Sequence, residues 1–433
     1  MQKLKVIART FEVKEDSKSG NCYRVITEDT VRGDAILSDM TTFGGKMAGI
    51  CYMPDDYLSD GIQDVERASK RANGNKKSGH YSVFEHGQIT FLLETNKMMA
   101  MILNSLNVYA TSEKSARYTV MKPETKNEDD KYNKWTYLFS KIIDGYYSFA
   151  AEDNFLNLNK SCTKDHTSVN KLAQENARYM LSIFTPTVMS YTVSFKQAIM
   201  IGQWLHNLAK ECSLRFNINP IYQLDNYCEE LSVLILDAVG VNINDLPLID
   251  HKGQYIRFIS NISSKTGSDK KEHIADSYTL RYECSLACLA QAERHRSIRY
   301  SFDAYSLIHK KYYIPEIIKG TPYEKEWIKD LNKYDKNMIP QALLVDVTEQ
   351  GIFEDFYLKC LERLCSRAQL EIQRLTEESV MKFKNNTEYL SRQNVAKLCG
   401  MFNNDKLTPR CQFEGYTCKE PCSYGASGLC RNI

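Results

Sequence analysis

The sequence has neither a long apolar run nor an excess of charge of one sign. No apolar stretch in its 433 residues is long enough to span a bilayer, and the opening Met1–Arg9 is too short and too polar for a signal peptide. The 56 basic and 54 acidic residues give a net charge of only +2, so any anion site must be local. These absences predict a cytoplasmic protein with no membrane or nucleic-acid partner.

What is present describes a globular protein with a repeated pattern. Hydrophobic residues make up 43% of the chain and charged residues 25%, and the length favours two domains or two fused copies of one domain. A β-like run at 278–283, followed by an apolar helical stretch, repeats a similar pattern that begins at 89, with a spacing of 189 residues. We therefore predict an internal duplication; the alternative is two unrelated strand–helix units.

Local patterns predict several further elements. β-branched residues at 187–194 indicate a strand, and the amphipathic pattern at 195–215 indicates a helix. The remaining expectations are a charged loop at 121–134, a helix from about 135 to 154, a segment that starts at Glu175, a junction loop at 251–273 and a helix from about 353 to 375.

Cysteine is concentrated near the C-terminal end. Ten of the 14 cysteines are scattered from Cys22 to Cys399, and we interpret them as reduced core thiols. In a cytoplasmic chain the remaining cluster favours zinc or an iron–sulfur cluster, although its spacing matches neither a zinc ribbon nor a ferredoxin. Disulfides, redox use and unligated thiols are the alternatives. The four clustered residues are Cys411, Cys418, Cys422 and Cys430.

The motif Arg294-His295-Arg296 follows an apolar segment that begins at Ser285. On a helix that leaves a buried face, the two guanidiniums would be fixed donors for a phosphate or the edge of a planar ring. His295 would tend to be neutral, because adjacent cations disfavour its charged form. The alternative is a solvated basic helix end, which the helix dipole favours.

Two polar turns in the first half are further candidate sites. The segment Gly79–His86 places two histidines, a serine and a glutamate before a strand, where ligands commonly bind. The two histidines could instead bind a metal, but no further histidine or carboxylate follows them at the spacing of a zinc site. The turn Ser115-Ala116-Arg117 offers backbone N–H groups, a hydroxyl and a guanidinium, which together suit a phosphate. Its alternative is an exposed loop.

With these motifs the chain resembles the flavin-dependent thymidylate synthases, which methylate dUMP using reduced FAD. The resemblance covers nearly all of residues 40–380, in two diverged copies. The first copy carries the family motifs at Gly79–His86, Glu113–Tyr118, Ala177–Leu181 and Thr192–Lys196. The second carries Gln291-x-x-Arg294-His295-Arg296, Leu361-Glu-Arg363 and Ala368-Gln369-x-Glu371-Ile372.

Each copy lacks motifs that the other has. The first has Ser105-Leu106-Asn107 in place of Arg-His-Arg and Leu205 in place of the later helix arginine, whereas the second lacks Ser-x-Arg-Tyr. In the family, the substrate site is shared between subunits of a homotetramer. The resemblance therefore implies one composite site between the two copies, and a homodimer that mimics the tetramer.

The fold that the resemblance implies is α+β. We expect two tandem units at 1–250 and 251–400, each a mixed or antiparallel sheet packed with long helices, and a Cys-rich tail at 401–433 that could bind a metal.

The resemblance also implies a role for each motif residue, with Arg294, His295, Arg296, Ser115 and Arg117 as the catalytic group. Lys196 and Ser194 replace the usual arginine and asparagine of the FAD set. The dUMP contacts would be Glu113, Ser115, Ala116, Arg117, Arg178, Gln291, Arg294 and Arg363. The FAD contacts would be Cys51, His80, Ser82, Glu85, Glu113, Ser194, Lys196, Arg294, His295 and Arg296.

The implied reaction converts dUMP to dTMP with NADPH and methylenetetrahydrofolate as co-substrates. It needs no cysteine nucleophile, because fixed cations polarise the uracil ring. The alternatives are a related one-carbon transfer to another pyrimidine nucleotide, or a non-catalytic protein that binds nucleotide or flavin.

Overall fold

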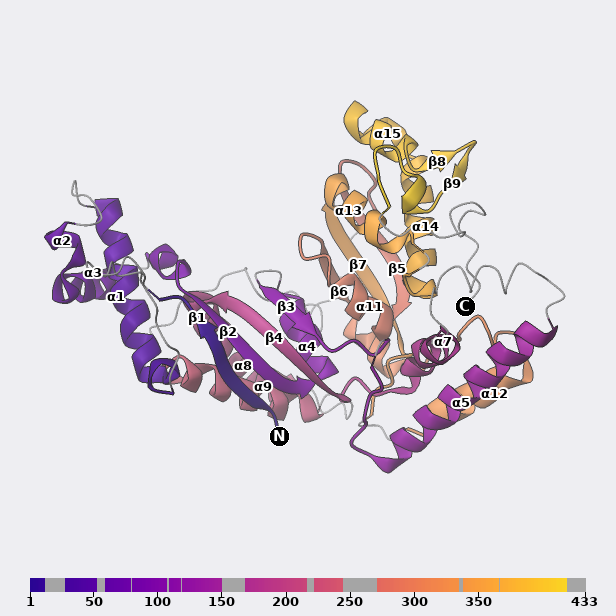
Figure 1. The fold of residues 1–433 in the computed structure, drawn as a ribbon, viewed down its shortest axis with the longest axis horizontal. Helices are drawn as coiled ribbons and strands as arrows, with labels where there is room; N and C mark the ends of the chain where they lie inside the picture. The colour runs from indigo at the N-terminus through magenta and orange to yellow at the C-terminus, as the bar shows by residue number, and fades with distance from the viewer. Residues whose placement is uncertain are drawn as a thin grey trace, which may run out of the picture. The chain divides into compact units, whose positions relative to one another are not determined.

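The structure, a computed structural model, divides into two compact units that do not follow chain order (Figure 1). Unit 1 comprises Met1–Ala100, Val108–Lys114 and Thr187–Tyr255, and unit 2 comprises Met101–Asn107, Ser115–Pro186 and Ile256–Ile433. The sequential domains 1–250 and 251–400 and the internal duplication stay predictions. The structure describes residues 1–11, 28–52, 59–78, 80–106, 109–117, 119–149, 168–215, 222–243, 271–334, 338–365 and 367–418.

Unit 1 is built on a four-stranded sheet in the order β1-β2-β4-β3, in which β1 pairs antiparallel with β2 and β3 with β4. Alternate residues of β2, such as Ile89, Phe91 and Leu93, are buried, as a strand with one face on the core requires. Helices α8 and α9 pack together beneath this sheet in Figure 1. The strands are β1 (Lys3–Arg9), β2 (Gln88–Asn96), β3 (Ala110–Glu113) and β4 (Pro186–Ser194). The helices are η1 (Asp29–Val31), α1 (Gly33–Tyr52), α2 (Asp60–Gln63), α3 (Val65–Ser78), η2 (Tyr81–Glu85), α4 (Lys97–Asn104), α8 (Phe195–Arg215) and α9 (Tyr222–Ala238).

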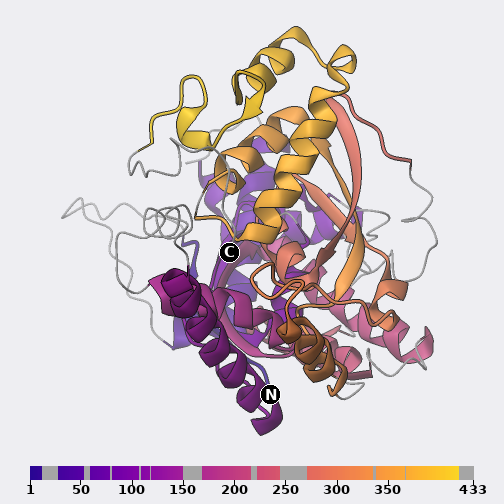
Figure 2. The ribbon, with the colours of Figure 1, turned by 90° about the vertical axis from the view of Figure 1, so that its right-hand side faces the viewer.

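Unit 2 is built on the antiparallel sheet β5-β7-β6, whose core face is covered by α13 and α14. Tyr278 and Leu280 of β5 pack there with Phe353, Phe356 and Phe383, and Figure 2 shows α14 beside the sheet. The strands are β5 (Ser277–Ser285), β6 (Arg299–Phe302), β7 (Leu344–Ile352), β8 (Phe402–Asn403) and β9 (Lys406–Leu407). The helices are α5 (Lys126–Phe149), α7 (Ser168–Ala177), η3 (Arg178–Met180), α11 (Leu286–Ala292), η6 (Ala304–Ile308), α12 (Pro322–Asn332), α13 (Phe353–Arg363), α14 (Leu370–Lys384), η7 (Thr387–Tyr389), α15 (Arg392–Cys399) and η8 (Arg410–Gln412).

Helices α5 and α12 lie side by side in unit 2 (Figure 1). The rings of Trp135 and Trp327 meet edge to face with centroids 4.8 Å apart, and both side chains are fully buried. Lys134 of α5 pairs with Asp330 of α12 at 2.5 Å. This aromatic and ionic contact holds a segment of the N-terminal half against the C-terminal half.

The two sheets contain similar strand–helix units, and the α+β prediction is confirmed. Each end of β5 falls 189 residues after the corresponding end of β2, and each strand runs directly into a helix. In the same way, β4 runs into α8 at Phe195 and β7 runs into α13 at Phe353. The strand at 187–194 and the helix at 195–215 are thus where the sequence predicts them.

Two helix predictions and one segment prediction were wrong at their boundaries. The helix expected from about 135 begins at Lys126, because Thr125 caps it and Glu128 and Asp129 suit the positive end of its dipole. Glu175 lies in the last turn of α7 and does not start a segment. The helix expected over 353–375 is two helices, because Leu364 leaves the helical conformation and its carbonyl accepts the N–H of Arg410 at 2.8 Å.

No helix in the described part of the chain is both long and apolar enough to cross a bilayer. Most of the predicted junction loop, 251–270, lies outside the described residues, as do Cys422 and Cys430 of the tail and Asn107.

Candidate functional site

Arg178 is the buried centre of a polar cluster in unit 2. Backbone bonds from Ala342 N–H to the Tyr179 carbonyl and from Ile183 N–H to the Ile339 carbonyl, both 2.9 Å, hold η3 beside the segment that precedes β7. The guanidinium donates to Gln369 Oε1 at 3.0 Å and to the Ala287 carbonyl at 3.1 Å. Arg178 is only 6% exposed, and its Nε has no partner among the described residues.

Gln291 and Arg363 come to the same cluster from α11 and α13. Gln291 Nε2 donates to Gln369 Oε1 at 2.6 Å and to the Ala287 carbonyl at 3.1 Å. Arg363 donates to the Gln291 carbonyl at 3.0 Å and to His295 Nε2 at 2.9 Å. The structure therefore joins residues of both predicted half-sites inside unit 2.

The turn Ser115-Ala116-Arg117 also lies in unit 2 and is closed by local bonds. Ser115 Oγ accepts the Arg117 N–H at 3.3 Å, and the Ser115 carbonyl accepts both the N–H and the hydroxyl of Thr119. The Arg117 guanidinium donates to the Arg367 carbonyl at 2.8 Å and lies 3.9 Å from Glu175. Arg117 is thus held against the segment that links α13 to α14.

The three guanidiniums form a cationic cluster. Burial lowers the pKa of Arg178 and of Arg363, and the charge of Arg117 lowers both further. Glu175, Glu371 and Glu362 oppose this effect. An anion placed among these guanidiniums would relieve their repulsion, so the cluster suits a phosphate.

His295 is a neutral hydrogen-bonding group. Burial, followed by the charges of Arg363 and Lys359, lowers the pKa of His295 to about 2. Since Arg363 can only donate, His295 Nε2 accepts and the proton resides on Nδ1. The cations that act on His295 therefore come from α13, whereas the sequence pointed to its neighbours Arg294 and Arg296.

The depressed pKa of His295 predicts acid sensitivity. Below pH 6.5 the unfolded chain binds a proton at His295 that the folded chain excludes, so stability falls as pH falls from 6.5 towards 2. In urea unfolding, the contribution of His295 should make the free energy of unfolding about 1.4 kcal/mol lower at pH 5.5 than at pH 7.5. In His295→Asn that part of the pH dependence should vanish; an unchanged pH slope would contradict the assignment.

Arg294 and Arg296 lie in turns, so the prediction that they project from a helix was wrong. Helix α11 ends at Ala292, after which the N–H groups of Arg294 and His295 bond three residues back to the carbonyls of Gln291 and Ala292. This tightening turns the chain so that His295 is buried while Arg296 is exposed.

A second polar cluster, in unit 1, contains part of the predicted FAD set. Glu85 accepts a hydrogen bond from the Ser194 hydroxyl and an ion pair from Lys196 Nζ at 2.9 Å. His80 and Ser82 are exposed at the start of η2, next to Glu85 in the chain. Two members of the set lie elsewhere in unit 1: Glu113 pairs with Lys97 at 2.5 Å, and Cys51 is exposed in the last turn of α1.

The sequence motifs assign no role to the buried residues that support Arg178. Tyr179 Oη donates to Glu371 Oε2 at 2.8 Å, and Glu371 also accepts the N–H and hydroxyl of Ser285 at 2.7 and 2.6 Å. Burial raises the pKa of Glu371, and these donors oppose the rise. The motif Ala368-Gln369-x-Glu371 was the only signal that could have identified this network.

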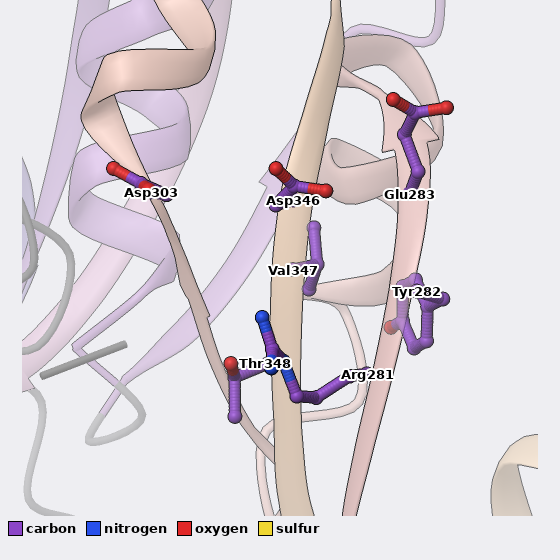
Figure 3. A pocket seen from close by; sticks show the side chains of 7 residues that line it. All are labelled: Arg281, Tyr282, Glu283, Asp303, Asp346, Val347 and Thr348. Carbon is purple, nitrogen blue, oxygen red and sulfur yellow. The ribbon is translucent and has the colours of Figure 1, made fainter. Parts of the chain in front are cut away.

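A pocket of about 260 Å³ lies elsewhere in unit 2, and no predicted site residue lines it (Figure 3). The polar lining residues of β5 alternate along the strand with the residues that pack against α13 and α14, and they pair with the polar lining residues of β7. The pocket therefore lies on the face of the sheet opposite to α13 and α14. Lys311 pairs with Glu283 there at 2.6 Å. Among the described residues no group of His, Cys, Asp and Glu is arranged to hold a metal. The lining residues are Arg281, Tyr282, Glu283, Asp303, Asp346, Val347 and Thr348.

The metal prediction for the tail is open to direct measurement. Cys411 and Cys418 are half-buried, and the other two cysteines lie outside the described residues. Metal analysis of protein purified without oxygen should find about one zinc ion, or iron in cluster amounts, per chain. A Cys411→Ser variant should lose it. Less than about a tenth of that amount, with freely titrating thiols, would contradict metal binding.

Comparisons with known proteins agree with the first set of motifs. Residues 43–209 match the family model described as thymidylate synthase complementing protein. No curated protein matches the chain. Two solved structures of the UMP/dUMP methylase PolB from Streptomyces cacaoi, bound with 5-Br dUMP and with 5-Br UMP, are 16% and 15% identical to the chain. They cover 55% and 48% of this chain and 89% and 76% of their own, with TM-scores of 0.29 and 0.22. The motifs at 79–86, 113–118, 177–181 and 192–196 all fall within the matched segment, so the match covers the part of the chain that carries the first set of motifs.

Proposed function

We propose that this protein is a flavin-dependent thymidylate synthase that converts dUMP to dTMP with methylenetetrahydrofolate and NADPH. The observation that carries the proposal is the cationic cluster of unit 2. There Arg117 and Arg178, from the segment that the family model matches, lie with Gln291 and Arg363 from outside it. Each motif set lacks what the other provides, so the cluster supports one composite substrate site.

The dUMP phosphate would bind Arg117, Arg178 and the Ser115 turn. Arg178 Nε is a buried donor with no partner among the described residues, which suits an incoming anion. Charge-assisted hydrogen bonds of this kind contribute roughly 1.5–3 kcal/mol each. Gln291, Arg294 and Arg363 would hold the uracil and ribose, and Ala116, buried in the turn, would offer its backbone amide. Glu113 is a further predicted nucleotide contact.

Activation of the uracil would be electrostatic. Burial raises the pKa of the thiols of Cys284, in β5, and Cys288, in α11. Neither cysteine therefore supplies a thiolate at neutral pH. Arg294, Arg363 and the neutral imidazole of His295 would instead donate hydrogen bonds that stabilise negative charge on a pyrimidine carbonyl oxygen.

The residues of unit 1 fit the polar part of a flavin dinucleotide. His80 and Ser82 are accessible hydrogen-bonding groups, and Glu85 orients Ser194 and Lys196 beside them in the same unit. Lys196 keeps the positive charge of the arginine usual in the family but lacks its fork. These side chains would hold FAD, whereas Cys51, Glu113, Arg294, His295 and Arg296 stay FAD contacts that the resemblance alone implies. FAD, once reduced by NADPH, supplies the hydride chemistry.

The proposal is tested by assaying purified protein with FAD, NADPH and methylenetetrahydrofolate that carries a labelled one-carbon unit. Transfer of the label to dUMP, with loss of the hydrogen at C5, is the expected result. Transfer to UMP or dCMP but not to dUMP would replace the proposal with a related pyrimidine-nucleotide methyltransferase. Nucleotide binding without transfer would indicate a non-catalytic protein. We also expect a homodimer, and a strictly monomeric mass would contradict that expectation.

A further inference from the structure

The carboxamide of Gln369 lies between two site residues from different parts of the chain. Its Oε1 accepts hydrogen bonds from Arg178 at 3.0 Å and from Gln291 Nε2 at 2.6 Å. Its Nε2 donates to the Tyr179 hydroxyl, which donates to Glu371. Gln369 is 2% exposed and precedes α14, at the break between the two helices. None of the roles assigned above uses this residue.

The direction of every bond in this chain is determined by its ends. A guanidinium can only donate, so the oxygen of Gln369 faces Arg178 and its nitrogen faces Tyr179. At the other end, Ser285 Oγ accepts the Cys288 N–H at 3.0 Å and therefore donates its own hydrogen to Glu371. Glu371 is thus an acceptor, which agrees with Tyr179 as a donor to it.

The orientation of the Gln291 amide follows. The Ala287 carbonyl can only accept, so the nitrogen of Gln291 faces it as well as Gln369 Oε1. The Gln291 oxygen then points away from both, and it is buried with no partner among the described residues. A buried acceptor left in this state requires a donor from a ligand or water.

We propose that Gln369 is a positioning residue that fixes the Gln291 carboxamide with its oxygen towards the pyrimidine, and so selects an imide N–H. This inference rests on the proposed function and specifies its substrate. Uracil has an N–H at ring position 3, which the Gln291 oxygen accepts. Cytosine has a bare acceptor nitrogen there, so two acceptors face each other and a buried group stays unpaired. The site therefore prefers dUMP to dCMP.

Two variants and a control test the role of Gln369. In Gln369→Met the bonds to Arg178, Gln291 and Tyr179 are lost, and only the Ala287 carbonyl still holds the Gln291 amide. The Gln291 oxygen is then less firmly oriented, so the preference for dUMP over dCMP should fall from about 100-fold to less than about 10-fold. Gln369→Glu keeps the acceptor that faces Arg178 and Gln291, so it should retain the preference. Gln341→Met is the matched control, because Gln341 is 4% exposed and its Nε2 donates to the Ser182 carbonyl, at 3.2 Å, and not to a predicted site residue in the described part of the chain.

The measurement is calorimetric titration of the full chain with dUMP and with dCMP, with thermal melting to confirm that each variant is folded. A change in the ratio of the affinities for dUMP and dCMP indicates a positioning role. The loss of a purely structural residue would weaken the binding of both nucleotides to the same extent. If the wild type binds dUMP and folded Gln369→Met keeps the ratio, or folded Gln369→Glu loses it, the inference is wrong while the proposed function stands. If the wild type binds neither nucleotide, both fail.

Discussion

Arg178→Ala is expected to weaken dUMP binding by about two orders of magnitude or more, and to reduce turnover at least as much. In the proposed site, the variant would remove the charge-assisted hydrogen bonds from Arg178 to the phosphate, each of which contributes roughly 1.5–3 kcal/mol. Arg178→Lys should recover only part of the loss, because an ammonium cannot donate in the geometry of a guanidinium fork. Titration with dUMP and steady-state kinetics measure the two effects.

The matched control is Arg374→Ala in the same unit. Arg374 has a 41% exposed side chain that pairs with Glu316 at 3.1 Å, so its loss should leave dUMP binding unchanged. Arg178→Ala also leaves the buried Ala287 carbonyl without its guanidinium partner, so thermal melting must show that the variant is folded at the assay temperature. A folded Arg178→Ala that binds dUMP like the wild type would contradict the phosphate role.

Lys359→Met is expected to lower the free energy of unfolding by about 3–5 kcal/mol. Lys359 Nζ lies 2.6 Å from Glu349 Oε2, and both side chains are fully buried. The hydroxyls of Tyr278 and Tyr282 also donate to Glu349, at 2.9 and 2.6 Å. Without its cation, the carboxylate of Glu349 would be an unpaired charge in the core, and this lowers the free energy of unfolding. Urea unfolding of the full chain measures the change.

The double variant Lys359→Met with Glu349→Gln should recover at least about half of that loss, because it removes the unpaired charge. Lys319→Met is the surface control: Lys319 has a 61% exposed side chain and pairs with Glu316 at 3.1 Å, so its loss should change stability by less than about 1 kcal/mol. A Lys359→Met variant within that same limit would show that the buried pair does not stabilise unit 2.

Local features of the fold could be predicted because neighbouring residues determine them. The strand at 187–194 and the helix at 195–215 follow from β-branched and amphipathic patterns within single segments. The end of α13 could not be predicted, because the carbonyl of Leu364 is bound by Arg410, far along the chain. That break places Gln369, which a continuous helix over 353–375 would have carried elsewhere.

The same distinction applies to the site. Arg117, Arg178, Gln291 and Arg363 could be nominated from motifs, since guanidiniums in such patterns suit phosphate. The residues that support them could not be nominated in this way. Gln369 and Glu371 gain a role only because η3 packs beside the segment that precedes β7. The division into units was also hidden, since the contact of Trp135 with Trp327 is set by tertiary packing and not by local pattern.

The most direct test of the proposed function is an absorbance spectrum of the purified full-length protein before and after addition of dUMP. We expect a flavin spectrum, present as isolated or after addition of FAD, that dUMP perturbs in the wild type but not in Arg178→Ala. A colourless protein that takes up no added FAD and whose spectrum dUMP leaves unchanged would contradict it.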